Sequence, residues 1–417
     1  MRAMKDSGIE CVGDIPVDWS MRRLRFLCFI TTGNQDTQDN DPDGEYPFYV
    51  RSPIVERSHK YTFDGPAILM SGDGAGAGRI FHKVSGKYAC HQRVYSMQNI
   101  HDIDSAFLFY YLRELFPVTL EMANAKSTVD SVRLPMLQDF TVLLPSPAEQ
   151  QRIAAYLDDQ CGEIDKVLTK TRESIEEYKK LKQSVITEAV TKGIRPDRPM
   201  KPSGIEWIGD IPAEWGMRRL RHLGCCQNGI SKGAEFFDSG YPFVSYSDVY
   251  KNMELPHKVN GLVESTDEER ERYSVLRGDI FFTRTSETIE EIGFTAVCLK
   301  TIPNATFAGF LIRVRPTTPL ITPEFSKYYF RNDSHRCFFV KEMNLVTRAS
   351  LGQELLKSLP VLLPPLDEQQ EIATYLDRQC AEIDRLIAKK EQIITELEGY
   401  KKSLIYECVT GKREVAG

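Results

Sequence analysis

This 417-residue chain has no apolar run that approaches the roughly 20 residues needed to span a bilayer. Its amino end, MRAMKDSGIE, lacks the apolar centre of a secretory signal peptide. Apolar residues still make up 41% of the chain and aromatic residues 10%, which is ordinary for globular proteins and excludes wholesale disorder. We therefore expect a cytoplasmic protein with no membrane partner.

Metal and disulfide motifs are also missing. None of the ten cysteines forms a C-x-x-C pair, the seven histidines do not cluster, and no H-E-x-x-H motif occurs. Cys161 and Cys380 occupy equivalent positions in two helical patterns, where a small buried thiol is expected. The sequence thus predicts neither a bound metal nor a disulfide framework.

Motifs of catalysis and a basic excess are absent as well. The chain has no glycine-rich cofactor loop of the methyltransferase type and no Asn/Asp-Pro-Pro-aromatic motif. Its formal net charge of -6 gives no global signature of nucleic-acid binding, which usually appears as a basic domain. We therefore expect a non-catalytic binding protein without a cofactor of its own, in which any nucleic-acid surface is local.

What the chain does contain is a repeat on a large scale. The segment SGIECVGDIPVDWSMRRLRFL at 7–27 returns as SGIEWIGDIPAEWGMRRLRHL at 203–223, and VLLPSPAEQQRIAAYLDDQCGEID at 142–165 returns as VLLPPLDEQQEIATYLDRQCAEID at 361–384. The stretches between them show no such correspondence, so one scaffold carries two different inserts. This division predicts globular domains and helical segments with the bounds 1–145 (domain), 146–195 (helix), 196–363 (domain) and 364–412 (helix).

The two helical segments predict unusually long helices. The first opens with Ser146 as N-cap, Pro147 at the first helical position and Glu149 as the partner in a capping box, and it ends at Gly193. In the second copy Pro365 replaces the capping serine. About 45 residues give a rod of roughly 67 Å with a narrow apolar stripe and charged outer faces. An antiparallel coiled coil buries both stripes, and the alternative is two helices lying separately on their own domains.

Both inserts predict mixed α/β domains. Short apolar runs bounded by turn residues are typical of strands, and each set is followed by one helical pattern. The fold class is therefore α/β (α+β), with two similar domains, two long helices and a pseudo-twofold internal repeat. In the first insert the expected strands are 46–50, 67–70, 79–81 and 93–95, with a helix at 105–115; in the second they are 241–244, 279–283, 294–298 and 310–314, with a helix at 324–330.

A glycine-rich stretch, SGDGAGAGR at 71–79, follows a strand of the first insert. Three interpretations are open: a cofactor loop, a plain hairpin loop, or a loop that approaches a phosphate backbone. The first is disfavoured because the G-x-G-x-x-G register is absent and a strand follows in place of a helix. The third is favoured because basic and amide side chains, which supply phosphate and base-edge contacts, come next.

Polar and basic residues stand at matching places of the two inserts. Any one of them would ordinarily be a solvated surface position, but as a set they indicate nucleic-acid binding. The candidate contacts are Ser71, Asp73, Arg79, Lys83, Lys87, His91, Gln92, Arg93, Lys126, Ser127, Thr128 and Arg133 in the first half, and Arg277, Thr283, Arg284, Thr285, Ser286, Asn304, Thr306, Arg313, Thr347 and Arg348 in the second.

The repeated segments at 7–27 and 203–223 and at 142–165 and 361–384 resemble those of the specificity (S) subunit of Type I restriction-modification systems. The stretch from SGDGAGAGRIF to STVDSVRLPMLQDF likewise resembles a target recognition domain of that family. The resemblance covers essentially the whole chain. It implies two target recognition domains, each reading one half of a split, asymmetric site in double-stranded DNA.

The resemblance also implies partners. The paired helices would set the spacer between the half-sites and dock two modification (methyltransferase) subunits, which bring S-adenosylmethionine and adenine methylation. A restriction (endonuclease and translocase) subunit would bring ATP and magnesium. Two other classes stay open at this point: a coiled-coil scaffold whose inserts bind protein, and an uncharacterised enzyme that acts on nucleic acid.

Overall fold

Two long helices carry the second pair of repeated segments. Helix α3 spans Pro147–Lys192 (46 residues) and α9 spans Leu366–Val409 (44 residues). The amide of Glu149 donates to Ser146 Oγ at 3.3 Å, and Gly193 follows the helix with φ +77, so the predicted start and end of α3 are confirmed.

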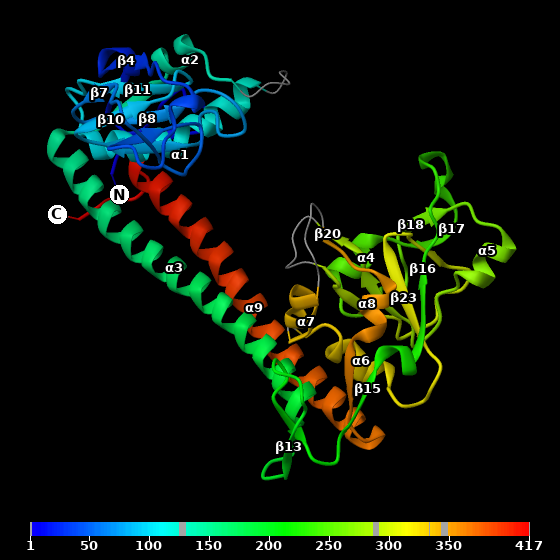
Figure 1. Ribbon diagram of the computed structural model, residues 1–417. Coiled ribbons are helices and arrows are strands. Elements are labelled where there is room, and N and C mark those ends of the chain that lie inside the picture. Colours follow the sequence, from blue (N-terminus) through cyan, green and yellow to red (C-terminus); the bar gives the residue numbers. More distant parts are fainter. Residues whose placement is uncertain (1, 125–130, 287–291, 333, 343–348, 417) are drawn as a thin grey trace. The chain divides into compact units, whose positions relative to one another are not determined.

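The computed structural model describes residues 2–124, 131–286, 292–332, 334–342 and 349–416 (Figure 1). The chain forms two units, Met1–Arg172 with Lys390–Gly417 and Glu173–Lys389. Each unit contains one globular head together with part of α3 and part of α9. We name residues 2–145 the N-terminal head and residues 196–363 the C-terminal head.

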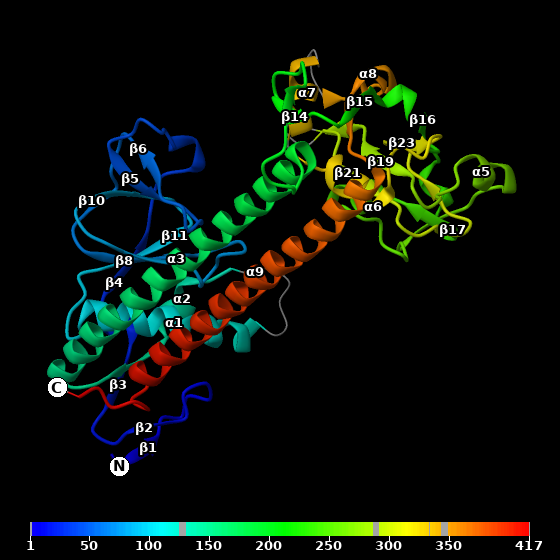
Figure 2. The same ribbon diagram turned by 90° about the horizontal axis from the view of Figure 1, so that it is seen from below.

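Within each unit the two long helices run antiparallel, as predicted. In the first unit Lys401 Nζ lies 2.6 Å from a carboxylate oxygen of Asp165, and Arg172 pairs with Glu398 at 2.6 Å. In the second unit Lys182 pairs with Asp384 at 2.7 Å. In the first unit the partner numbers fall along α9 as they rise along α3, and within each unit the two helices lie side by side in both views (Figures 1 and 2).

The N-terminal head contains two four-stranded sheets and two strand pairs. The sheets have the orders β4-β11-β8-β9 and β6-β5-β10-β7, and the pairs are β1-β2 and β3-β12. Strands β5 and β10 pair in parallel, and the other pairs between described strands of this head are antiparallel. The elements are β1 (Met4–Asp6), β2 (Asp14–Pro16), β3 (Ser20–Arg23), β4 (Phe29–Thr32), β5 (Tyr46–Tyr49), β6 (Glu56–Ser58), β7 (Phe63–Asp64), β8 (Ala67–Ser71), β9 (Phe81–Val84), β10 (Lys87–Cys90), β11 (Val94–Gln98), α1 (Ser105–Asn124), α2 (Leu134–Gln138) and β12 (Thr141–Leu144).

The C-terminal head repeats this plan. Its sheets have the orders β16-β23-β19-β21 and β18-β17-β22, with β17 and β22 parallel, and its pairs are β13-β14, β15-β25 and β20-β24. The elements are β13 (Met200–Pro202), β14 (Asp210–Pro212), β15 (Gly216–Arg219), β16 (Gly224–Asn228), β17 (Phe237–Val244), α4 (Tyr246–Lys251), β18 (Gly261–Val263), α5 (Asp267–Arg272), β19 (Ile280–Thr283), β20 (Thr285–Ser286), β21 (Thr295–Val297), β22 (Thr306–Phe307), β23 (Leu311–Pro316), α6 (Pro323–Tyr329), α7 (Ser334–Glu342), β24 (Ala349–Ser350), α8 (Gln353–Ser358) and β25 (Pro360–Leu363).

The mixed α/β architecture with a repeated head is therefore confirmed, and the bounds of some predicted strands move by a residue or two. The strand expected at 93–95 begins at Val94, and the strand expected at 310–314 begins at Leu311. Arg93 and Phe310 consequently stand in the turns ahead of these strands. Arg79 likewise precedes β9, which begins at Phe81.

Each head takes turns of both long helices into its core. The first core joins Trp19 and α1 to Leu157 near the start of α3 and to Leu404 near the end of α9. The second core joins Trp215 to Val190 near the end of α3 and to residues of the first turns of α9. Each long helix therefore contributes the turns at one end to the first core and the turns at its other end to the second core. A shift of either helix along its axis would expose apolar surface.

Cys161 and Cys380 lie buried on the long helices, as expected, and burial raises the pKa of both thiols. All ten cysteines are free thiols. In the part of the chain that the structure describes, no group of three or more His, Cys, Asp and Glu side chains is arranged to hold a metal ion. Within the same residues, no helix combines the length and apolarity needed to cross a membrane.

Candidate functional site

Three loops of the N-terminal head meet at one edge of the sheet β4-β11-β8-β9. Strand β11 runs antiparallel to both β4 and β8, so its start lies beside their ends. Two backbone hydrogen bonds join the loops: Gly33 N donates to Val94 O at 3.3 Å, and Gly72 N donates to Arg93 O at 2.8 Å. We name residues 33–36, 71–79 and 91–93 the first loop edge.

The C-terminal head builds the same edge with other side chains. Gly229 N donates to Leu311 O at 3.4 Å, and Arg284 N donates to Phe310 O at 2.9 Å. These bonds repeat those of the first head and make Arg284 the counterpart of Gly72. We name residues 229–232, 283–286 and 308–310 the second loop edge.

The segment ahead of each long helix joins the same edge. Val132 N donates to Gly72 O at 2.8 Å, and Leu351 N donates to Arg284 O at 2.7 Å. The neighbouring residues add bridges, Asp73 with Ser131 in one head and Thr285 with Ser350 in the other. Residues 131–132 and 349–351, which precede the long helices, therefore border the loop edges. Lys126, Ser127, Thr128, Thr347 and Arg348 lie outside the described residues.

The glycine-rich stretch is the connection of a β-hairpin, since β8 and β9 pair antiparallel on either side of it. Gly78 has φ +67, its amide donates to Ser71 O at 2.8 Å, and a Cβ at this position would lie 2.8 Å from Leu120 Cδ2. The second head keeps this one glycine: Gly293 also has φ +67, and its amide donates to Thr283 O at 3.1 Å. Glycine is required at both places because a side chain would be both strained and obstructed.

Charged groups dominate the first loop edge. Asp73 Oδ1 lies 3.2 Å from Arg51 Nη1, and its Oδ2 lies 3.7 Å from Arg93 Nε. Gln92 Nε2 donates to Asp36 Oδ2 at 3.2 Å. The amide of Thr37 donates to Asp36 and lowers the pKa of its carboxyl, and the nearby imidazole of His91 acts in the same direction. This edge thus presents oriented guanidinium and amide donors.

The second loop edge is less charged and more aromatic. Tyr246 Oη donates to Thr285 O at 2.8 Å. This contact of the second head corresponds to the ion pair of Arg51 with Asp73 in the first head. Phe310 is 64% exposed, although it is a large apolar residue. Lys232 lies 2.7 Å from Glu269 and lowers the pKa of that carboxyl. The two heads therefore share a backbone frame and differ in the chemistry that it presents.

Five candidate contacts lie in the interior and not on the surface. Thr283 Oγ1 accepts from the amide of Phe294 at 2.8 Å, and Arg313 donates to Ser274 O at 2.6 Å. Such bonds hold Thr283 and Arg313 in the interior, where their side chains pack under the sheet and do not face solvent. The five are Ser71, His91, Thr283, Thr306 and Arg313.

Other candidates are exposed but stand away from the loop edges. Lys83 lies on β9 opposite Ile68, and Lys87 Nζ lies 4.8 Å from the ring centroid of Tyr61. Arg277 donates to Glu324 at 2.5 Å near the start of β19, which is the opposite end of the strand from Arg284. The exposed Asn304 precedes β22 with φ +57.

Seven candidates lie at or beside the edges and reach the surface. The exposed ones are Arg79, Gln92, Arg93 and Arg133, and the half-buried ones are Asp73, Arg284 and Thr285. Arg79 pairs with Glu121 of α1 at 3.1 Å. Ser286 belongs to β20. Sequence reasoning missed Arg51, Tyr246 and Phe310, because only the strand pairing brings these residues beside the predicted loops. An aromatic residue directly ahead of an apolar strand was the one local signal for Phe310.

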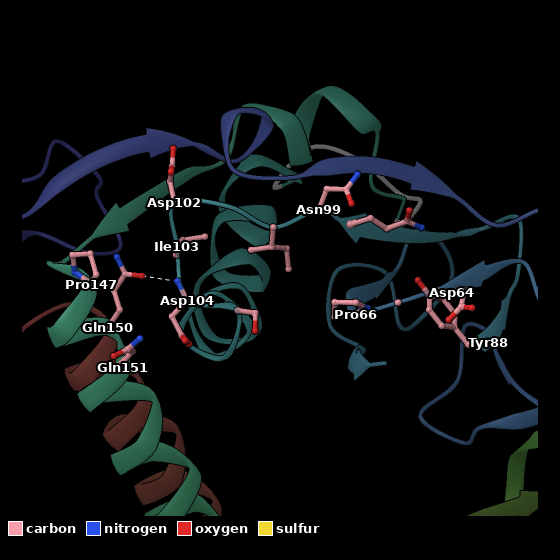
Figure 3. Close-up of a pocket in the computed structure, with 14 residues that line it drawn as sticks. Asp64, Pro66, Tyr88, Asn99, Asp102, Ile103, Asp104, Pro147, Gln150 and Gln151 are labelled. Atoms are coloured by element: carbon pink, nitrogen blue, oxygen red, sulfur yellow. Dashed lines mark hydrogen bonds between the residues drawn. The ribbon is translucent and has the colours of Figure 1, made fainter. Parts of the chain in front are cut away.

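A cavity of about 700 Å³ lies at the other end of the first sheet, between the start of β8, the end of β11 and the start of α3. Figure 3 shows Gln150 at this cavity, with its side-chain oxygen accepting from Asp104 N at 2.7 Å. In the second head Gln369 accepts in the same way from Thr322 N at 2.8 Å. These glutamines of the repeated Glu-Gln-Gln motif join each head to its long helix, away from the loop edge.

The comparisons with known proteins agree with this duplicated plan. The family described as Type I restriction modification DNA specificity domain matches residues 16–177 and 212–398. Each match covers most of one head and part of a long helix. The chain belongs to this family.

Two curated relatives match almost the whole chain of this family member. The EcoDI specificity subunit of a Type I restriction enzyme from Escherichia coli is 23% identical over 416 residues, covering 96% of this chain and 90% of its own. The MjaVIII specificity subunit from Methanocaldococcus jannaschii is also 23% identical, covering 96% of this chain and 94% of its own.

A solved structure shares the fold of this family member. Its description reads "complex assembly and conformational transition of the type I R-M system", and one of its chains aligns with a TM-score of 0.71 at 16% identity. The alignment covers 96% of this chain and 99% of that chain. The arrangement of the elements within the heads is therefore shared with this solved structure.

Proposed function

We propose that this chain is the DNA-recognition subunit of a Type I restriction-modification complex, in which each head reads one half of an asymmetric, bipartite site in double-stranded DNA. One observation carries the proposal: two loop edges share a backbone hydrogen-bond pattern but expose different side chains. Base edges are read by side chains, and the backbone frame only positions them. Two unlike edges on one frame therefore read two unlike half-sites.

The partners follow from this role. Two modification subunits would dock on the paired helices and supply S-adenosylmethionine and adenine methylation, and restriction subunits would supply ATP-driven steps with magnesium. The chain itself carries no catalytic site in this proposal, and it works in the cytoplasm beside the DNA.

The test is selection of binding sites by the complex of this chain with its modification subunits. A random DNA duplex pool is bound, recovered and sequenced through several rounds. We expect two conserved half-sites of different sequence separated by a spacer without preference. Arg93→Ala should relax only one half-site, and a bidentate base contact is worth about 1–3 kcal/mol.

Three results would refute the proposal in whole or in part. A complex that binds DNA without sequence preference, or not at all, would favour a protein-binding scaffold. Methyl transfer or DNA cleavage by the purified chain, in a preparation shown to be free of partner subunits, would show an enzyme. Loss of discrimination in both half-sites from Arg93→Ala would exclude independent heads.

A further inference from the structure

The turn ahead of β11 in one head corresponds residue by residue to the turn ahead of β23 in the other. Gln92 N donates to Gln35 O at 2.8 Å, and Gly309 N donates to Ile230 O at 2.7 Å. Gly309 is thus the counterpart of Gln92. The correspondence comes from the backbone bonds, because the two inserts share no sequence similarity at these positions.

The next residue of each turn follows the same rule. The carbonyl of Arg93 accepts from Gly72 N at 2.8 Å, and that of Phe310 accepts from Arg284 N at 2.9 Å. The side chain of Arg93 is 63% exposed, and Phe310 is 64% exposed. Two residues of opposite chemistry therefore project from one place in the repeated frame.

The first turn presents hydrogen-bond donors at the surface. The carboxylate of Asp73 lies 3.7 Å from Arg93 Nε and 3.2 Å from Arg51 Nη1, so it forms ion pairs with both guanidinium groups. Gln92 stands beside Arg93. A guanidinium donates in pairs to O6 and N7 of guanine, which is the commonest specific contact in the major groove.

The second turn has no such donor. Gly309 carries no side chain, and a Cβ there would lie only 2.4 Å from Ser231 Oγ, so the close approach of the chain excludes a glutamine. Phe310 offers only an apolar ring. The 5-methyl group of thymine is the one apolar feature by which a major-groove edge is recognised.

We infer that Arg93 and Phe310 are equivalent specificity-determining residues of the two heads, and that Phe310 selects a thymine through its 5-methyl group where Arg93 selects a guanine. The inference rests on the proposed function and assigns the base class at one position of each half-site. Leaving an aromatic ring exposed forgoes the free energy of its burial, and contact with a methyl group recovers part of it.

The experiment uses the complex with its modification subunits and the selected bipartite site. Each thymine is replaced in turn by deoxyuridine, which removes only the methyl group, and each guanine by 7-deazaguanine, which removes only N7. We expect one deoxyuridine to weaken wild-type binding about fourfold, as burial of one methyl group predicts. One 7-deazaguanine in the other half-site should weaken it about tenfold.

Variants assign these losses to residues. Phe310→Ala should bind the thymine and deoxyuridine duplexes equally, while Phe310→Leu keeps an apolar contact and part of the preference. Phe310→Ala should retain the loss of affinity caused by 7-deazaguanine, which shows that the variant complex is intact. Arg93→Ala should lose the response to 7-deazaguanine and keep the response to deoxyuridine.

A bipartite site in which no thymine responds to deoxyuridine, or a Phe310→Ala complex with the wild-type ratio, overturns the inference and leaves the proposed function standing. Persistence of the 7-deazaguanine effect in Arg93→Ala overturns the equivalence of the two residues. Absence of any bipartite site overturns both proposals.

Discussion

The carboxylate of Glu368 accepts a hydrogen bond from the indole nitrogen of Trp215 at 3.0 Å, and Glu149 accepts from Trp19 at 3.1 Å in the same way. Each glutamate also pairs with an arginine near the start of its head: Glu368 with Arg198, and Glu149 with Arg2. The indoles belong to the first repeated segment and the glutamates to the second. The two repeated segments thus contact each other through this joint, by which we mean the tryptophan, the glutamate and the arginine together. Their mutual contact explains why the segments recur together while the inserts between them differ.

Removal of this joint should destabilise the second unit strongly. Glu368 is fully buried, so Glu368→Ala leaves Arg198 without its main partner in a site where its side chain is only 8% exposed. Breaking a buried pair in this way costs about 3 kcal/mol or more. Urea denaturation, followed by indole fluorescence, measures the loss.

Two matched variants control this prediction. Glu149→Ala should cost less, because Glu149 and Arg2 keep 13% and 24% of their side chains exposed. Glu214→Ala removes the exposed second partner of Arg198 and should change stability little. Equal losses in all three variants would contradict the role of burial.

The antiparallel pairing of the helices can be tested by exchanging charges. Lys401 Nζ lies 2.6 Å from Asp165, so Lys401→Glu and Asp165→Lys should each weaken the first unit through like-charge contact. The double exchange restores the attraction and should show a coupling energy of about 1 kcal/mol. Denaturation of the four proteins of the cycle gives this value. Zero coupling would exclude contact between these positions in solution.

A buried carboxyl predicts a dependence of stability on pH. Burial raises the pKa of Glu114 to about 7, against the weaker lowering effects of Lys402 and Arg113. It lines a cavity of about 430 Å³ in the first unit, together with Arg79, Arg113, Asp165, Leu168, Arg172, Glu398, Lys401, Lys402 and Ile405. The folded chain holds this proton more tightly than the unfolded chain does.

Stability is therefore lost as the pH rises from the usual carboxyl range through about 7. Glu114→Gln removes the cost of ionisation, so variant and wild type should agree near pH 4 and the variant should be more stable at pH 8. The gain is about 1 kcal/mol, because water near the cavity screens part of the cost. Denaturation at several pH values measures it, with the exposed Glu121→Gln as the control. A pH-independent difference would contradict the assignment.

The long helices and the division into heads could be predicted because their signals are local. A capping serine, a terminal glycine and an apolar stripe define α3 in the sequence alone. Their pairing followed from the need to bury two stripes, and its antiparallel sense followed from the internal repeat. Eight strands were predicted from short apolar runs that end at turn residues, and five of these eight were located to within two residues at both ends. The other strands of the heads were not predicted.

The candidate site was predicted only in part, because residue type does not show which way a side chain faces. Arg313 is basic, yet it lies buried on the central strand β23, where its two terminal nitrogens donate to Ser274 O and Gln227 Oε1. The equivalence of Arg93 and Phe310 has no trace in the sequence. It is defined by backbone bonds between loops, and these bonds constrain the fold without constraining the side chains.

A last prediction concerns the helices as the element that sets the spacer. Both are continuous, with 46 and 44 residues, and each contributes to both units. One added heptad lengthens a helix by about 10.5 Å and rotates its end by only about 20° relative to whole turns, so the buried stripe is preserved. A copy of 171–177 inserted after Lys170 and a copy of 390–396 inserted after Lys389 lengthen both helices equally.

The complex that carries both insertions should select the same two half-sites with a spacer about three base pairs longer, at roughly 3.4 Å per base pair. Site selection or methylation mapping provides the measurement. Insertion into one helix alone shifts the apolar stripe of that helix relative to the stripe of the other. It should reduce the stability of the chain without producing a new preferred spacer length. If the doubly extended complex is stable and still prefers the original spacer, the helices do not set it, and the spacing must come from the partner subunits.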